Sequence, residues 1–552
     1  MNNRFFLTLS GGWLVACFCL LSIGAPQAQG KNGVTLVLDT SGYWRVHHTF
    51  MPPVLKDGRE ATPLATLTGT TPLPPKDWTQ PDFDDGQWLR QANKPLPGSK
   101  ANGVPDATAD SGAIGVEHGS PALGLTCLRA RFQVNNPSAV RNLSLSLAYR
   151  GGVAVYLNGK ELARGHLAAN APLDSLAEDY PPEAFFKSDG TPARMDAATA
   201  KDAAGIERCV GLRVRRLPAI EIPATRLVRG VNVLAIEIHR STLPSKLRDS
   251  FAGKQRHEWE AMLWNTCALV SARLTSDGTA GLVPNVTRPE GMQVWNSTML
   301  APDYDLDYGD PCEPLQPIRM VAPRQGMVSC KVVVGSDRPI KNLRGRVSEL
   351  ASQESKIPAA DVQVRYAMPW GIESSTPVGR FPAPASLMDG LEEVPPDEVP
   401  VRAKKLLGPP YVTADQPPFV FGAVAPVWVT VAVPADAAPG EYRGTLTISS
   451  AGMGKPVAVP LELKVCSWRC PPPGEFRTIV NIMESPESVA MQYGVPLWGP
   501  RHWELLAKSL DRLGYVGNWT LFVTLIGQTN LGNEQTMVRW VRKEGAGARV
   551  QG

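Results

Sequence analysis

Alternation of apolar and polar side chains with a period of two is the feature that most limits how this chain can fold. Val427, Val429 and Val431 alternate with Trp428 and Thr430. Successive residues of a strand point to opposite faces, so such runs predict antiparallel strands with one buried face. Gly 50 and Pro 51 together form about 18% of the 552 residues, against a usual ~12%, which favours short strands joined by turns. We therefore expect a mainly β protein of roughly three or four domains.

Charge and motif content exclude several classes of function. The chain carries 56 basic and 52 acidic residues, and the resulting net charge of +4 is spread along its length. Nucleic acids select concentrated basic surfaces, so we expect no nucleic-acid binding. The sequence contains no phosphate-binding loop, no G-x-S-x-G motif and no H-E-x-x-H motif. We expect no cofactor and no bound metal.

The first 29 residues have the pattern of a signal peptide. An uncharged run over residues 5–23 follows Arg4, and small residues over 24–28 provide a cleavage region. The residues around Cys17 also resemble a lipoprotein box, although apolar residues follow this cysteine where a lipidated cysteine is normally followed by polar ones. We predict a secreted or periplasmic protein.

Two further features agree with an exported chain without a stable membrane span. The uncharged stretch 416–435 contains four prolines and alternates with a period of two, so it predicts strand and turn. Cleavage leaves seven cysteines, an odd number that is too small for a disulfide scaffold.

Residues 34–275 have the pattern of a β-sandwich. Leu143, Leu145 and Leu147 lie on one face of a predicted strand, and Asn158-Gly159 between two extended runs predicts a hairpin turn. Residues 166–219 lack a clear period and are expected to be an insertion between strands.

Three segments of this domain resemble the galactose-binding-like jelly roll that accompanies many glycosidases: WTQPDFDDGQW (78–88), VAVYLNGKELARG (153–165) and LVRGVNVLAIEIH (227–239). The resemblance implies that Trp78 and Trp88 can form a platform for a sugar ring. Large aromatic side chains also dominate buried cores, and we prefer this second interpretation.

Residues 290–472 predict a second sandwich. The segments VWVTVAVPADAAPGEYRGTLTI (427–448) and VPLELKVCSWRCPPPGEFRT (459–478) resemble the N-terminal β-sandwich of glycoside hydrolase family 123. After the prolines at 471–473 the period changes: residues 477–483 predict a buried strand, and Pro500 opens a helix that ends at Gly514.

A second strand and a second helix complete two β/α units over residues 475–552, and these units resemble the start of the family's catalytic barrel. A complete barrel needs about 250 residues. We therefore expect only the start of a barrel in this chain. In such barrels the loops after the strands face the active site, so Glu484, Asn530 and Asn533 are candidates for contacts with a sugar or for ordinary turn and capping positions.

The resemblance implies hydrolysis of terminal β-linked N-acetylgalactosamine by an adjacent Asp-Glu pair, with the substrate's acetamido oxygen as nucleophile. No adjacent acidic pair follows residue 475, so we assign no catalytic residue and expect this chain to be inactive. Asp397-Glu398 lies in a proline-rich loop of the predicted sandwich, and we do not assign it to catalysis.

Asp303, Asp305, Asp307 and Asp310 have a spacing similar to that of a calcium loop. Glycine is displaced by one position, however, and Pro314 stands where the bidentate glutamate belongs. We expect a solvated strand edge here instead.

These observations lead to three hypotheses. The first is an exported carbohydrate-active protein that resembles the non-catalytic N-terminal part of a β-N-acetylgalactosaminidase and has a glycan as its partner. The alternative is a non-catalytic protein that binds carbohydrates or other proteins of the cell envelope. The third is a gene fragment without a function of its own.

Overall fold

The computed structural model describes sixteen stretches of the chain, and every structural statement below concerns them. They are residues 33–40, 42–59, 70–91, 122–193, 203–249, 265–301, 303–305, 307–369, 388, 390–401, 422–472, 475, 480–482, 489–490, 493–514 and 519–521.

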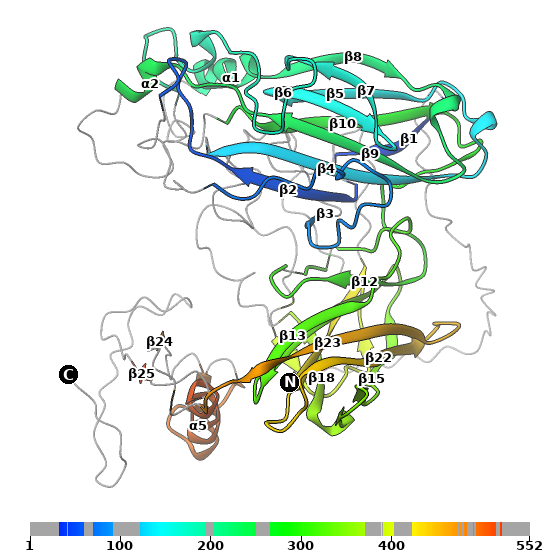
Figure 1. Ribbon diagram of the computed structural model, residues 1–552, viewed down its shortest axis with the longest axis vertical. Coiled ribbons are helices and arrows are strands. Elements are labelled where there is room, and N and C mark those ends of the chain that lie inside the picture. The colour runs from blue at the N-terminus through cyan, green and yellow to red at the C-terminus, as the bar shows by residue number, and fades with distance from the viewer. Residues whose placement is uncertain are drawn as a thin grey trace, which may run out of the picture.

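Two sheets form the first sandwich (Figure 1). The smaller sheet has the order β1 (Val34–Asp39), β10 (Ala268–Asp277), β5 (Ser144–Arg150), β8 (Arg215–Glu221). The larger sheet has the order β3 (Leu89–Gln91), β2 (Trp44–Phe50), β4 (Leu123–Val134), β9 (Gly230–His239), β6 (Gly152–Leu157), β7 (Lys160–Gly165), and β11 (Leu282–Val283) pairs with β4. The strand pairs in both sheets are antiparallel.

The core of this sandwich lies between its two sheets. Leu145 and Leu147 of β5 are buried against residues such as Leu128 and Ile236 of the larger sheet, as the alternating pattern predicts. The predicted hairpin joins β6 to β7, and Asn158 and Gly159 have φ angles of 50° and 76°. Both residues therefore adopt the left-handed conformation that this turn requires.

The predicted insertion extends too far at its C-terminal end. It contains η4 (Pro182–Ala184) and α1 (Ala203–Leu212), but strand β8 of the smaller sheet already begins at Arg215. Apolar and polar residues alternate only weakly in β8, because only one face of the strand is partly covered. The sequence pattern therefore does not predict this strand. Three short helices complete this part: η3 (Pro137–Ala139), η6 (Ala224–Arg226) and α2 (Ser245–Asp249).

The second sandwich also consists of two sheets. One has the order β12 (Met292–Ser297), β14 (Met327–Ser336), β21 (Ala423–Ala432), β18 (Val362–Met368), β19 (Gly390–Glu392). The other has the order β13 (Ile318–Arg324), β23 (Val457–Arg469), β22 (Gly440–Ala451), β15 (Ile340–Val347), β20 (Glu398–Val399), with β16 (Leu350–Ala351), β17 (Lys356–Ile357) and η8 (Ala359–Asp361) beside it.

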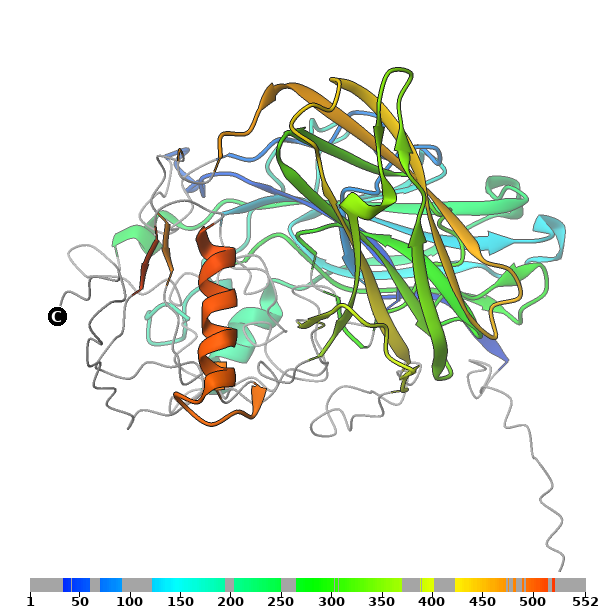
Figure 2. The ribbon, with the colours of Figure 1, turned by 90° about the horizontal axis from the view of Figure 1, so that it is seen from below.

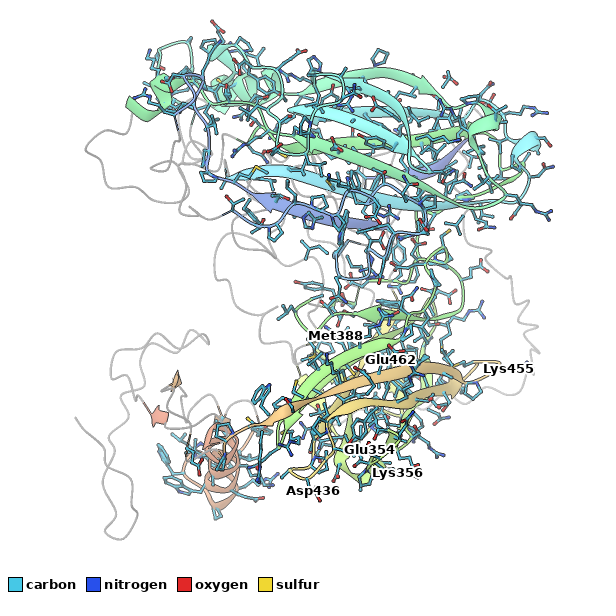
Figure 3. All side chains as sticks on the ribbon, in the orientation of Figure 1. Glu354, Lys356, Met388, Asp436, Lys455 and Glu462 are labelled. Carbon is cyan, nitrogen blue, oxygen red and sulfur yellow. The ribbon has the colours of Figure 1, made fainter. Side chains whose placement is uncertain are left out.

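Val427, Val429 and Val431 are fully buried between these sheets, whereas charged side chains such as Glu354 and Lys455 lie on the outside (Figure 3). The predicted mainly β fold with two sandwiches is confirmed.

The C-terminal part has a strand–helix–strand order. Strand β24 (Val480–Ile482) pairs in parallel with β25 (Trp519–Leu521), and α5 (Pro500–Gly514) lies between them in sequence. The helix begins and ends at the residues that the sequence predicts. Figure 2 shows α5 outside the layers of both sandwiches. None of the helices in the described stretches is long and apolar enough to cross a membrane.

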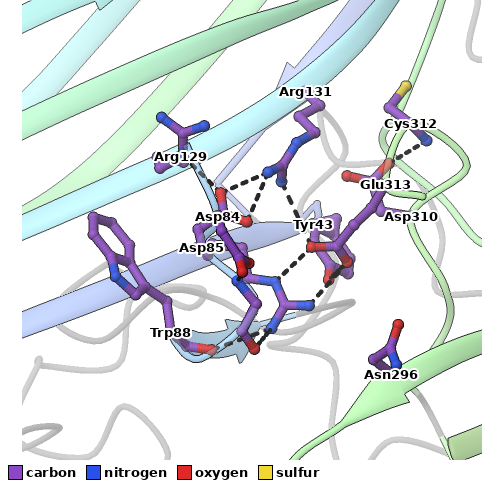
Figure 4. A network of polar contacts seen from close by, with 12 residues as sticks. Tyr43, Asp84, Asp85, Trp88, Arg129, Arg131, Asn296, Asp310, Cys312 and Glu313 are labelled. Carbon is purple, nitrogen blue, oxygen red and sulfur yellow. Dashed lines mark hydrogen bonds and ion pairs between the residues drawn. The ribbon is translucent and has the colours of Figure 1, made fainter. Parts of the chain in front are cut away.

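A buried ionic network joins the two sandwiches (Figure 4). Glu313, in the connection between β12 and β13, accepts hydrogen bonds from Arg45 Nε (2.8 Å) and Arg45 Nη2 (2.9 Å) of the first sandwich, and from the hydroxyl of Tyr43. Arg131 lies 3.7 Å from the same carboxylate and donates to both oxygens of Asp85, at 2.6 and 2.7 Å. Burial raises the pKa of Glu313, but Arg45 and Arg131 outweigh it and hold the pKa below its ordinary value.

The four aspartates with calcium-like spacing belong to this junction, and the expected solvated edge is wrong. All four are at most 5% exposed. Asp303 accepts a hydrogen bond from Lys331 Nζ at 2.5 Å, and Asp310 accepts one from Asn285 Nδ2 at 2.8 Å. Donors to the carboxylates of Asp303, Asp307 and Asp310 compensate part of their lost hydration. In the described part of the chain, no group of three or more His, Cys, Asp or Glu side chains could hold a metal ion.

We predict that Glu313→Gln lowers the free energy of unfolding by about 3–5 kcal/mol, because it leaves Arg45 buried without a full countercharge. Urea unfolding followed by circular dichroism measures this. The control is Glu462→Gln, which removes the partner of the exposed Arg319 (69% exposed side chain) and should cost at most about 1 kcal/mol. Equal losses in the two variants would contradict the role of the buried network.

Candidate functional site

The two tryptophans proposed as a sugar platform are buried. Trp78 is 2% and Trp88 is 8% exposed, and both pack on the outer face of the larger sheet of the first sandwich, against Leu125, Cys127 and Ala235. Neither ring presents a face to solvent. This burial favours the core interpretation, and sugar binding at the two residues stays a prediction.

The other sequence candidates lie elsewhere. Glu484, Asn530 and Asn533 fall outside the described residues. Asp397 and Glu398 are exposed at the edge of the second sandwich, where Glu398 lies 3.3 Å from Lys341 Nζ. The seven cysteines that follow the predicted signal peptide are free thiols.

A pocket of about 630 Å³ lies on the first sandwich. Figure 1 shows α1 and α2, which contribute to its lining, at one end of this sandwich. Four separate segments form the pocket, and we call it the α1–α2 pocket. Its lining residues are Lys56, Asp57, Pro182, Glu183, Phe186, Lys187, Ser188, Gly190, Arg208, Pro244, Ser245 and Lys246.

Backbone hydrogen bonds hold one wall of the α1–α2 pocket. Leu55 and Leu243 form a parallel bridge, in which Lys56 N donates to Leu243 O at 2.9 Å. The bridge places the turn after β2 beside the start of α2. Across it, Ser245 Oγ donates to Asp57 Oδ2 at 2.8 Å. The wall is therefore fixed by both main-chain and side-chain contacts.

A tight loop holds the opposite wall. Phe186 bridges Pro192, and Asp189 Oδ1 accepts hydrogen bonds from Thr191 N (2.9 Å) and Thr191 Oγ1 (2.6 Å). The thiol of Cys209, which is buried in α1, contacts the carbonyl of Phe186 at 3.2 Å and ties the helix to this loop. Phe186 is only 6% exposed and contributes a small apolar part of the lining.

Positive side chains dominate the α1–α2 pocket. Four lining residues are cationic and two are acidic. A side-chain hydrogen bond from Arg59, 2.6 Å long, holds the pKa of Asp57 well below its usual range. The excess of cationic over acidic side chains leads us to interpret the pocket as a binding site for a polar ligand.

There is a physical reason why the sequence does not reveal this site. Its lining residues are spread from Lys56 to Lys246, and most lie in or next to the predicted insertion, which has no period. The one local indication is the pair of phenylalanines followed by a lysine in the segment EAFFK (183–187).

No protein-family model matches the sequence, and no curated protein matches it significantly. Among solved structures, a family 123 glycoside hydrolase from Clostridium perfringens is similar over 43% of this chain and 38% of its own, at 16% identity and a TM-score of 0.32.

A glycosyl hydrolase family 2 member from Bacteroides cellulosilyticus is similar over 77% of this chain and 36% of its own, at 9% identity and a TM-score of 0.19. A β-glucuronidase from Bifidobacterium dentium is similar over 79% of this chain and 49% of its own, at 9% identity and a TM-score of 0.22. The chain thus spans less than half the length of each of these proteins. Likenesses at these scores assign neither family nor activity.

We predict that Trp78→Ala lowers the free energy of unfolding by about 3–5 kcal/mol, because it opens a cavity in a packed cluster. The matched control is Trp468→Ala, since Trp468 is 57% exposed and its loss should change stability by at most about 0.5 kcal/mol. Urea unfolding of both variants measures the difference. A stable Trp78→Ala variant would show that this ring is not a core residue.

Proposed function

We propose that this chain is the glycan-binding part of an exported carbohydrate-active protein of the family 123 type. The observation that carries the proposal is the α1–α2 pocket. Its volume of about 630 Å³ lies within the range of roughly 300–1,000 Å³ that is common for ligand sites. It combines apolar lining from Pro182, Phe186 and Pro244 with hydrogen-bonding side chains from several segments, which is what a sugar ring with hydroxyl groups on its rim requires.

The sequence resemblance supports the same proposal. The segments that resemble a galactose-binding-like jelly roll include β6, β7 and β9 of the sandwich that carries the pocket. The segments that resemble the family 123 sandwich form β21, β22 and β23 of the second sandwich. A binding site on the first sandwich would hold the glycan close to the part of the protein that modifies the glycan.

The proposal does not include hydrolysis by the 552-residue chain. Family 123 chemistry needs an adjacent Asp-Glu pair on the barrel, and residues 475–552 contain none. Asp397-Glu398 is exposed on the edge of a sandwich and lies in no pocket described above.

We expect the protein without residues 1–29 to bind immobilised glycans, and Ser188→Trp to abolish this binding. Ser188 is an exposed lining residue, so an indole at this position fills the pocket without disturbing the core. The matched control is Thr279→Trp in the turn between β10 and β11, at the opposite end of the sandwich. A glycan array of neutral and acidic sugars measures binding. Equal binding by the two variants would place the glycan site elsewhere, and no binding by the unmodified protein would refute the proposal.

We also expect no release of nitrophenol from a nitrophenyl β-N-acetylgalactosaminide, because the required acidic pair is missing. The assay uses the purified 552-residue protein. Asp397→Asn is the control, because it disrupts the adjacent pair Asp397-Glu398. Turnover that follows the protein through a sizing column and is lost in Asp397→Asn would show that this pair is catalytic after all.

A further inference from the structure

We propose that the α1–α2 pocket selects sugars that carry a negatively charged group, either a carboxylate or a sulfate ester. This inference rests on the proposed glycan binding and specifies the class of glycan. It follows from the charges that converge on the pocket and from the contacts that those charges make.

The four cationic side chains come from four different parts of the chain. Lys56 follows β2, Lys187 lies in the loop after η4, Arg208 lies in α1, and Lys246 lies in α2. Bringing like charges together costs energy unless an anion offsets it. Their convergence around one concave surface therefore favours an anionic ligand.

Two of the four cations lie near acids outside the lining. Lys56 Nζ lies 3.4 Å from Asp179, and Lys187 Nζ lies 3.6 Å from Asp189. Both distances exceed the roughly 2.7–2.9 Å of a charge-assisted hydrogen bond, and both pairs are solvent-accessible. Lys56, whose side chain is 67% exposed, can turn to a ligand at small cost. The lining contains two acids, Asp57 and Glu183. The charge of Asp57 is offset by its ion pair with Arg59.

Arg208 and Lys246 distinguish the site further. Arg208 makes no ion pair with any other described residue, although its guanidinium can bind a carboxylate or a sulfate through two parallel hydrogen bonds. Lys246 Nζ lies over the ring of Phe186, 5.3 Å from its centre, so at this point the pocket is bordered by a positive charge. A sugar bound beside Arg208 and Lys246 would place an acidic substituent within reach of both cations.

The test compares binding of four probes by isothermal titration calorimetry: glucuronic acid, N-acetylgalactosamine 6-sulfate, neutral N-acetylgalactosamine and inorganic sulfate. We expect at least one of the two acidic sugars to bind about tenfold more tightly than the neutral sugar. The double variant Arg208→Gln/Lys246→Gln should remove this preference. Both side chains are exposed, so the variant should fold normally.

The matched control is Lys160→Gln/Arg229→Gln, which removes the same charge from exposed positions at the opposite end of the sandwich. We expect it to bind like the unmodified protein, so that a general effect of net charge is excluded.

Each other outcome has a definite meaning. Equal affinity for neutral and acidic sugars would overturn this inference and leave the proposed glycan binding intact, whereas no binding of any sugar here or on the glycan array would overturn both. Inorganic sulfate that binds as tightly as the sulfated sugar would show a simple anion site and overturn the inference. The glucuronic acid and sulfate arms show which anionic group the pocket prefers.

Discussion

The arrangement of this protein depends on one buried carboxylate, Glu313, which comes from the second sandwich and is bound by Arg45 of the first. A buried charge is tolerated only when partners replace its hydration, and removing one partner of such a pair is strongly destabilising. Arg131 and Asp85 extend the network across the outer face of the larger sheet. The two sandwiches are therefore held by directional contacts that specify one relative position.

The junction and the α1–α2 pocket occupy different parts of the first sandwich. The larger sheet uses its outer face for the junction and for the cluster around Trp78, so that face is covered. The α1–α2 pocket is built at one end of the sandwich from its own segments, among them the bridge between Leu55 and Leu243. A ligand can therefore enter the pocket without disturbing the contacts between the sandwiches.

Sequence patterns predicted those parts of the fold that depend on local geometry. The alternation at Val427 to Val431, the Asn158-Gly159 turn and the limits of α5 each follow from a period or a turn preference, and the structure has all three. The burial of Asp303 to Asp310 and the pocket itself could not be predicted in this way. Both depend on contacts between residues far apart in sequence, such as Asp303 with Lys331 and Lys56 with Leu243.

A crystal structure of the protein soaked with N-acetylgalactosamine 6-sulfate would show directly whether the α1–α2 pocket holds an acidic sugar, because anomalous scattering locates the sulfur atom. We expect the sulfate to lie beside Arg208 and Lys246. A sulfated sugar bound at another place on the molecule, with the pocket empty, would contradict this expectation.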